Sequence, residues 1–201
     1  MIGTSKDIKY PGLNILPPGV ERHIVNGGGL TGFQIFPDDE IEIINNEGNQ
    51  ICEIISFDKD GNSDVGILNL KSNNEKNFIR NILSGNDETI LATNYQLKKR
   101  NLKISNSKSS IIFDLDTAPG EKIKLKSKDK CYAIFSAPGE DMDVTKQNPP
   151  TDLTIFVKRA KIVNDKELNV IPDPVFEPVY EENINQETSI SYEVKEGDYI
   201  Q

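Results

Sequence analysis

The sequence has no tryptophan, a single histidine and two cysteines among its 201 residues. The one histidine, His23, leaves little material for a zinc site or for catalysis built on imidazole groups. The two cysteines, Cys52 and Cys131, cannot form a disulfide framework, and a reducing cytoplasm is the simplest location for them. No stretch approaches the roughly 18 apolar residues of a transmembrane helix. Residues 1–11 also lack the apolar core of a secretion signal.

Positive charge is in short supply as well. The 23 basic and 32 acidic residues give a net charge of −9. This balance argues against duplex nucleic acid as the main partner, because phosphate binding needs a basic surface. The length fits one domain, or one domain with a tail. We therefore expect a cytoplasmic protein with neither a nucleic-acid nor a membrane partner, while a homo-oligomer is left open.

Short runs of alternating apolar residues dominate what is present. Residues 40–44 and 50–55 flank a turn rich in Asn and Gly at 45–48, which predicts a β-hairpin. Further strands are predicted at 64–70, 90–93, 110–115, 122–125, 131–136 and 153–159. The last of these is almost continuously apolar, which is typical of a central strand.

Only one segment has a helical pattern. Over residues 73–85 the apolar side chains at 78, 79, 82 and 83 share one face of a helix. Asn73 or Asn74 can cap its start and Gly85 its end. Many strands, frequent turns and one short helix predict a mostly-β fold, either a β-sandwich or a barrel-like domain.

The chain changes character after residue 168. Residues 169–188 are rich in proline and acidic residues, which favours an extended linker, and residues 189–201 resume a strand-like alternation. Residues 194–201 contain a turn followed by an acidic residue, one further residue and an isoleucine. The same sequence pattern occurs near residues 35 and 117. We therefore predict one domain over residues 1–168, a linker, and at 189–201 the first strand of a second, truncated copy.

A short motif in residues 37–57 resembles the urea-carboxylase-associated domain family. Gly48 and Gln50 match a Gly-x-Gln-x-x-Asp hairpin of that family, and Glu53 stands where aspartate is usual. Members of this family also occur ahead of folate-binding domains that are similar to the glycine-cleavage aminomethyltransferase. The resemblance covers residues 15–160 and implies that downstream domains of the same polypeptide are the partners of this chain.

The resemblance implies a role for the chain as well as a fold. Catalytic members of the family carry a metal-binding His-Asp pair and a downstream cysteine, but residues 114–129 contain no histidine, and Cys131 lies beyond them. We therefore predict a non-catalytic N-terminal accessory domain of a protein that resembles a folate-dependent aminomethyltransferase. No cofactor is expected in this chain, and tetrahydrofolate is implied for the parent only. The alternatives are a stand-alone, metal-dependent C–N hydrolase and a small calcium- or anion-binding module.

One acidic loop resembles the front of a calcium-binding loop. Asp58, Asp60, Asn62 and Asp64 supply oxygen atoms at alternating positions, which suits Ca²⁺. However, Ser63 occupies the position where glycine is needed, and Asn69 the position of the bidentate glutamate. A polar hairpin turn explains the same residues.

Alternating lysines form a second candidate site. Lys122, Lys124, Lys126, Lys128 and Lys130 fall on one face if residues 122–130 are a single strand. The functional interpretation is an anion-binding face for a phosphate, a polyglutamate tail or an acidic partner. The structural interpretation is an edge strand that lysine protects from aggregation.

Overall fold

The computed structural model describes residues 16–17, 19–73, 77–86, 88–139 and 148–161. Within them lie eight β-strands, two α-helices and one 3-10 helix. The elements are β1 (Val20–Val25), β2 (Leu30–Ile35), β3 (Glu40–Asn45), β4 (Cys52–Phe57), η1 (Val65–Leu68), α1 (Phe78–Leu83), α2 (Glu88–Lys99), β5 (Ser109–Phe113), β6 (Glu121–Lys126), β7 (Cys131–Ser136) and β8 (Leu153–Lys158). The prediction of a mostly-β fold is therefore confirmed. The predicted linker at 169–188 and the predicted strand at 189–201 lie outside the described residues.

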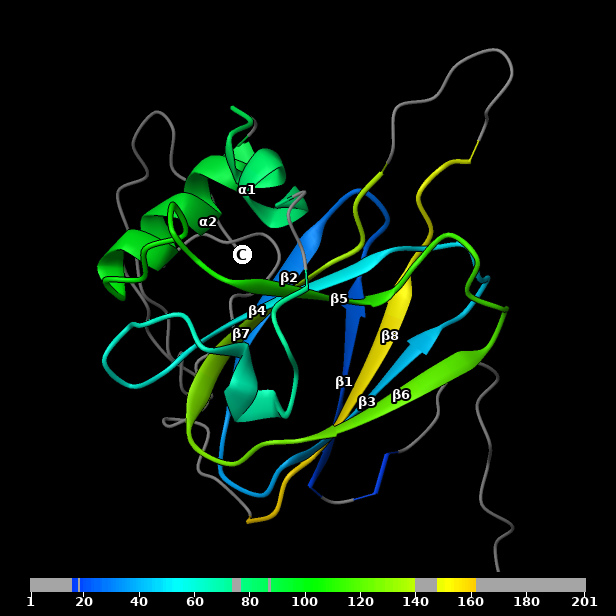
Figure 1. The fold of residues 1–201 in the computed structure, drawn as a ribbon, viewed down its shortest axis with the longest axis horizontal. Coiled ribbons are helices and arrows are strands. Elements are labelled where there is room, and N and C mark those ends of the chain that lie inside the picture. Colours follow the sequence, from blue (N-terminus) through cyan, green and yellow to red (C-terminus); the bar gives the residue numbers. More distant parts are fainter. Residues whose placement is uncertain (1–15, 18, 74–76, 87, 140–147, 162–201) are drawn as a thin grey trace, which may run out of the picture.

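The strands form two antiparallel sheets that face each other (Figure 1). Sheet A has the strand order β1-β8-β3-β6, and sheet B has the order β2-β7-β4-β5. In sheet A, β8 lies between β1 and β3 and pairs with both. In sheet B, β7 lies between β2 and β4 in the same way. The central strand predicted at residues 153–159 is thus β8.

The main core lies between the two sheets. Ile41 and Ile43 of β3 and Ile155 of β8 contribute from sheet A, and Phe33 and Phe135 contribute from sheet B. All five side chains are at most 1% exposed. Burying one side chain of this size stabilises the fold by about 1.5–3 kcal/mol, so this layer is the main source of stability.

The two helices cover the second face of sheet B (Figure 1). A separate apolar cluster joins Ile55 and Phe57 of β4 and Ile134 of β7 to Ile79 and Leu83 of α1. Every residue of β4 and β7 is therefore buried, which explains why both segments are mostly apolar on both faces. Among the described helices, none combines the length and the apolar character that crossing a membrane requires.

The predicted hairpin over residues 40–55 is wrong. β3 pairs with β6 and β8 in sheet A, whereas β4 pairs with β5 and β7 in sheet B. The turn between them crosses from one sheet to the other, with Gly48 at φ +77 and Asn49 at φ 55. An Asn/Gly turn can join two strands of one hairpin or two strands of different sheets. Here β3 and β4 belong to different sheets and bury their apolar faces against the same core from opposite sides.

Two other predicted strands are helical. Residues 64–70 contain η1, whose first turn is capped by the Asp64 carboxylate accepting from the Gly66 N–H. Residues 90–93 lie within α2, a helix that the sequence did not indicate. The periodicity of a short apolar run does not distinguish a strand from a helix. In α2 the helix is packed on the protein through Leu97, one turn after residue 93, which is buried against sheet B.

The predicted helix exists but is shorter than residues 73–85. α1 begins after Asn77, which adopts a left-handed conformation as the N-cap residue. Asn73 has another role, because its side-chain amide donates to the Ile111 carbonyl and accepts from the Ile111 N–H. Asn73, which the sequence suggested as the helix cap, instead holds the chain against β5.

Candidate functional site

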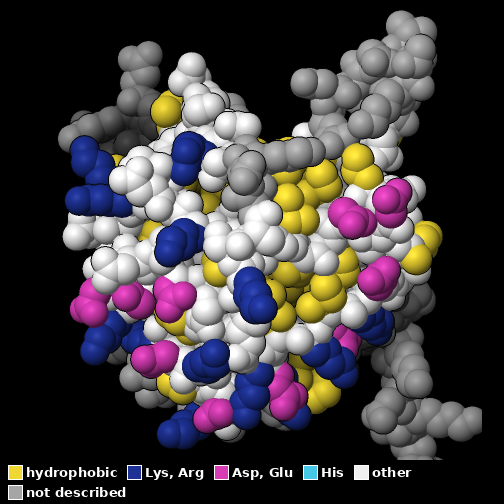
Figure 2. Space-filling model, in the orientation of Figure 1, with side chains coloured by type: hydrophobic (Ala, Val, Ile, Leu, Met, Phe, Trp, Pro, Cys, Tyr) yellow, Lys and Arg dark blue, Asp and Glu magenta, His cyan; other side chains and the backbone are white. Residues whose placement is uncertain are grey.

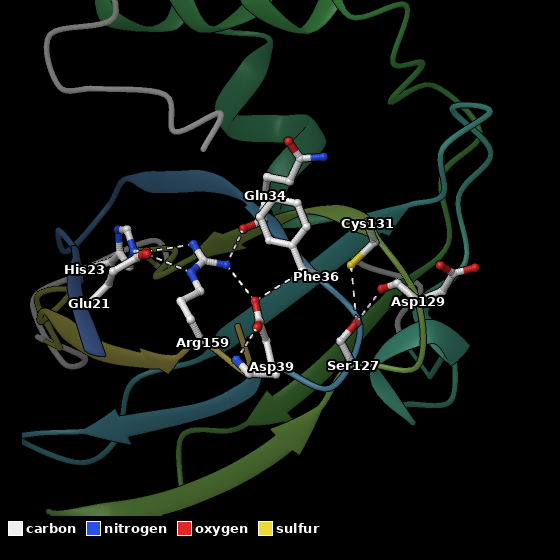
Figure 3. Close-up of polar contacts among 10 residues, drawn as sticks. Glu21, His23, Gln34, Phe36, Asp39, Ser127, Asp129, Cys131 and Arg159 are labelled. Carbon is white, nitrogen blue, oxygen red and sulfur yellow. Dashed lines mark hydrogen bonds and ion pairs between the residues drawn. The ribbon is translucent and has the colours of Figure 1, made fainter. Parts of the chain in front are cut away.

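A buried cluster of charged side chains lies where β8 ends (Figure 3). Glu21 and His23 alternate along β1, Asp39 immediately precedes β3, and Arg159 immediately follows β8. The side chains of Arg159 and Asp39 are 3% and 1% exposed. Charged residues are almost never buried to this extent unless they are paired, so their partners determine what the cluster does.

Arg159 is held by two carboxylates. Its Nε and Nη2 atoms donate to Oε1 and Oε2 of Glu21, both at 2.7 Å. Its Nη1 atom donates to Oδ2 of Asp39 at 2.7 Å and to the carbonyl oxygen of Gln34 at 2.9 Å. The bidentate fork to Glu21 is the strongest geometry available to an arginine–carboxylate pair. The guanidinium group therefore joins β1, β2 and the start of β3.

Asp39 is also saturated by backbone donors. Its Oδ2 atom accepts from the Phe36 N–H at 3.0 Å, and its Oδ1 atom accepts from the Ala160 N–H at 2.9 Å. These bonds fix the turn between β2 and β3, in which Asp38 adopts a positive φ of 68°. Phe36 lies beside the same charges, with Arg159 Cζ 5.6 Å from its ring centre. The cluster is thus a closed hydrogen-bonded unit.

His23 occupies the outer part of the cluster. Its Nε2 atom is 3.1 Å from Oε2 of Glu21. Its ring stacks on Phe33 with 4.2 Å between ring centres, and Phe33 in turn stacks on Phe135 at 5.1 Å. A lone histidine can act as a general base or pack as part of the fold, and these contacts support packing. The imidazole bridges the edges of both sheets.

We predict that Glu21 makes the protein sensitive to acid. Burial alone would raise the pKa of Glu21, but hydrogen bonds from His23 and Arg159 hold it at about 2, below its ordinary value of 4.5. A carboxyl whose pKa is depressed by folding contributes stability above its unfolded pKa and loses it as the pH falls. The melting temperature should therefore fall as the pH is lowered from 4.5 towards 2. Circular dichroism melts in that range test this, and E21Q should show a flatter pH dependence.

Both cysteines are buried and unpaired. Cys131 lies 4.0 Å, sulfur to oxygen, from the Ser127 hydroxyl, which itself donates to the Asp129 carbonyl at 2.6 Å (Figure 3). Burial raises the pKa of the Cys131 thiol to about 12 and raises the pKa of Cys52 as well. Because the thiolate is the reactive form, neither thiol is suited to nucleophilic catalysis.

This burial predicts slow thiol chemistry. In the native protein at mildly alkaline pH, an aromatic disulfide reagent should modify Cys131 on the order of a thousandfold more slowly than in urea, because its pKa rises from 9.0 to about 12. The absorbance of the released thiolate measures both rates. Rapid modification of one thiol per chain without denaturant would contradict the prediction.

The family-motif residues hold loops together. A Cβ atom on Gly48 would lie 2.7 Å from the Pro119 nitrogen, so both the contact and the positive φ require glycine. The Gln50 amide donates to the carbonyls of Ile51 and Pro138, both at 2.9 Å, and accepts from the Thr151 N–H at 2.7 Å. These contacts bring three loops together at one end of the sandwich.

The third motif residue, Glu53, lies apart from the other two. Its carboxylate is fully buried and accepts from the Ile79 N–H in α1 at 2.5 Å. It therefore anchors the helix to sheet B. The structure does not bring Gly48, Gln50 and Glu53 together around one point, and their described contacts are with the protein's own backbone.

The acidic loop at 58–64 forms a turn. Oδ1 of Asp58 accepts from the backbone N–H groups of Asp60 and Asn62, each at 2.8 Å, and its Oδ2 accepts from the Asn62 side chain. Asp64 caps η1. Across the part of the chain that the structure describes, no group of three or more His, Cys, Asp or Glu is arranged to hold a metal ion. The contacts are those of a polar turn.

The predicted lysine face belongs to β6 at the edge of sheet A. Lys122, Lys124 and Lys126 are exposed on the outer face, whereas Lys128 lies beyond the strand and donates to the Gly66 carbonyl. Lys130 is further still, with its ammonium 5.3 Å from the centre of the Phe36 ring. The structure therefore keeps three of the five lysines in one row.

Sequence reasoning missed the Arg159 cluster, although a signal was present. Leu153, Ile155 and Val157 face the core, so the same alternation places Arg159 on the apolar side of β8. A charged residue in that register indicates a buried pair. The partners themselves were not identifiable, because Glu21 is 138 residues away along the chain.

Comparison with known proteins shows a relative that matches nearly the whole chain. The chain is 31% identical over 194 residues to a trimethylamine-oxide aldolase of Ruegeria pomeroyi, a match that covers 96% of this chain and 24% of the aldolase. The chain thus spans about a quarter of the curated protein it matches. No family model matches the chain.

Among solved structures, the chain is similar to a DUF1989 family protein from Silicibacter pomeroyi. It covers 71% of this chain and 80% of its own, with 11% identity and a TM-score of 0.39. A TM-score this low does not establish a shared fold, so the relation to the urea-carboxylase-associated family has only loose support.

The functional prediction from sequence is corrected by the aldolase. The relative that matches nearly the whole chain is an aldolase acting on trimethylamine oxide, which overturns the prediction of an accessory domain in an aminomethyltransferase-like protein. The name of this relative is also that of neither a C–N hydrolase nor a small binding module, the two alternatives from the sequence. The sequence resemblance identified a short motif and assigned the wrong chemistry to it.

Proposed function

We propose that this chain is a β-sandwich domain of a larger enzyme that cleaves a C–N bond in a methylated amine oxide. The observation that carries the proposal is the match to trimethylamine-oxide aldolase along 96% of the chain. The fold supports a domain role, since two sheets enclose a complete core and the Arg159 cluster closes one end of it. The two unpaired thiols fit a cytoplasmic location.

The proposed reaction balances without an outside oxidant. Trimethylamine oxide contains only methyl carbons, so the aldehyde that an aldolase releases from it must be formaldehyde. One methyl group loses a hydrogen and gains the oxygen as the N–O and C–N bonds break, and the nitrogen leaves as dimethylamine. The carbon is oxidised while the amine oxide is reduced. Trimethylamine lacks the oxygen and cannot undergo the same reaction.

The test is an assay of the complete natural polypeptide that contains this chain. With trimethylamine oxide as substrate, we expect formaldehyde and dimethylamine in equal amounts, and with trimethylamine we expect neither. A folded, purified protein that releases no formaldehyde from trimethylamine oxide would overturn the proposal. Tetrahydrofolate stays an untested prediction for the parent, and parallel assays with and without it show whether it accepts the formaldehyde.

We also propose a distant relation to the urea-carboxylase-associated family, based on Gly48 and Gln50. Both residues have tasks that depend on their identity, a positive φ beside Pro119 for Gly48 and three backbone hydrogen bonds for Gln50. A crystal structure of this chain tests the relation. The relation would be supported if a glutamine in a superimposable loop of a family member made the same three backbone hydrogen bonds. A different strand order would reject it.

A further inference from the structure

The negative charge of the chain is concentrated at one end. Residues 162–201 contain ten acidic and two basic residues, so they carry eight of the nine net negative charges. The preceding 161 residues contain 22 acidic and 21 basic residues and are almost neutral. A strongly acidic segment is therefore attached to a nearly neutral sandwich, and the position of the basic groups on that sandwich decides where the segment is attracted.

A row of exposed lysines lies on the outer face of sheet A. Lys122, Lys124 and Lys126 of β6 have side chains that are 52%, 79% and 57% exposed. Lys122 and Lys124 share one carboxylate, that of Glu42, at 3.5 and 3.3 Å. Lys126 pairs with Asp38 at 2.9 Å, so the three ammonium groups face two carboxylates and one positive charge is in excess. Figure 2 shows Lys and Arg side chains interspersed with Asp and Glu side chains along its lower edge, the side on which β6 lies in Figure 1.

The chain leaves the sandwich beside these lysines. In the register of sheet A, Lys158 at the end of β8 lies opposite Glu40, and Glu40 lies opposite Lys126. Two strand spacings of about 4.8 Å place Lys126 about 10 Å from this exit. Lys161, the last described residue, is close enough to lower the pKa of Asp38, although Lys126, through its hydrogen bond, is the main cause of that shift.

We propose that the acidic segment, residues 162–201, docks on the lysine row of β6. A single exposed ion pair contributes little, but several pairs form together when the segment is tethered about 10 Å away, because the tether supplies a high effective concentration. The docked segment also shields the edge strand β6 from pairing with another chain. A second basic group, Lys98 and Lys99 with nearby Lys103, belongs to α2 and the loop after it, on the sheet B side of the molecule.

Carbodiimide cross-linking of the unmodified full chain tests the contact, because the reagent joins carboxylates directly to nearby amines. We expect cross-links within one molecule between residues 162–201 and Lys122, Lys124 or Lys126. Their yield should fall about threefold or more as the salt concentration approaches 1 M, where screening acts within about 3 Å. The Lys124–Glu42 pair, at 3.3 Å, provides an internal standard for the reaction.

A proteolysis experiment gives a second readout. A glutamate-specific protease should cut the segment at Glu177, Glu181 and Glu182 roughly threefold faster in K122Q/K124Q/K126Q, since cleavage follows the population of the undocked form. The matched variant K98Q/K99Q/K103Q removes the same charge elsewhere and should leave the rate unchanged. Circular dichroism checks that each variant is folded. If a variant does not fold, cross-linking of the unmodified chain alone tests whether the segment docks on β6.

Three results would overturn the proposal. The segment could cross-link mainly to Lys98, Lys99 or Lys103, it could cross-link only between two molecules, or both triple variants could be cut at the wild-type rate. None of these experiments involves the reaction of the parent enzyme. A failure here is therefore distinguishable from a failure of the proposed function.

Discussion

Replacing Arg159 by methionine should destabilise the protein by about 3–5 kcal/mol, because removing one member of a buried ion pair leaves its partners charged and unpaired. Asp39 would keep its carboxylate at 1% exposure without a cation. Glu21 would lose both of its 2.7 Å bonds from the guanidinium. Because a domain is stable by only about 5–15 kcal/mol, this loss is a large share of the total.

Urea unfolding followed by far-UV circular dichroism measures the change. The adjacent substitution K158M is the control, since the Lys158 side chain is 67% exposed and its 3.4 Å pair with Glu40 should contribute little. Adding D39N to R159M should recover part of the loss by removing the stranded charge. Equal costs for R159M and K158M would show that the cluster does not stabilise the fold.

The substitution F33A should have a comparable effect, a loss of about 3–5 kcal/mol, because it leaves a cavity in a close-packed core. Phe33 is fully buried and lies between the rings of His23 and Phe135, so its removal takes a contact from both sheets. F33L fills most of the space and should cost less than about 1.5 kcal/mol. Urea midpoints of the two variants test the ranking, and equal values would indicate that the site collapses without a cavity.

The sequence predicts strands best where local pattern and burial agree. β7 matches the predicted residues 131–136, and β8 differs from its prediction only at Arg159. Both strands are apolar because both faces are covered or nearly so. The predicted pairing of β3 with β4 was wrong because turn residues indicate that the chain reverses direction but not which sheet the next strand joins.

The charged cluster was beyond sequence reasoning for a related reason. Asp39 and Arg159 are 120 residues apart along the chain, and in an acidic chain Asp39 does not stand out from the acids on either side of it. The alternation along β8 marks Arg159 as inward-facing, but it does not name a partner. The partner follows only from the strand order of sheet A, which the hydrophobic pattern leaves undetermined.

That strand order has a consequence for how the protein is made. β8 joins β1 to β3, yet it is synthesised about 130 residues after β1. On the ribosome, β1 therefore emerges without its partner and must wait for nearly the whole sandwich. Sequence-distant pairing slows folding and prolongs the exposure of apolar strands. A chain that stops before Leu153 cannot assemble sheet A, so premature termination yields an aggregation-prone product rather than a smaller folded domain.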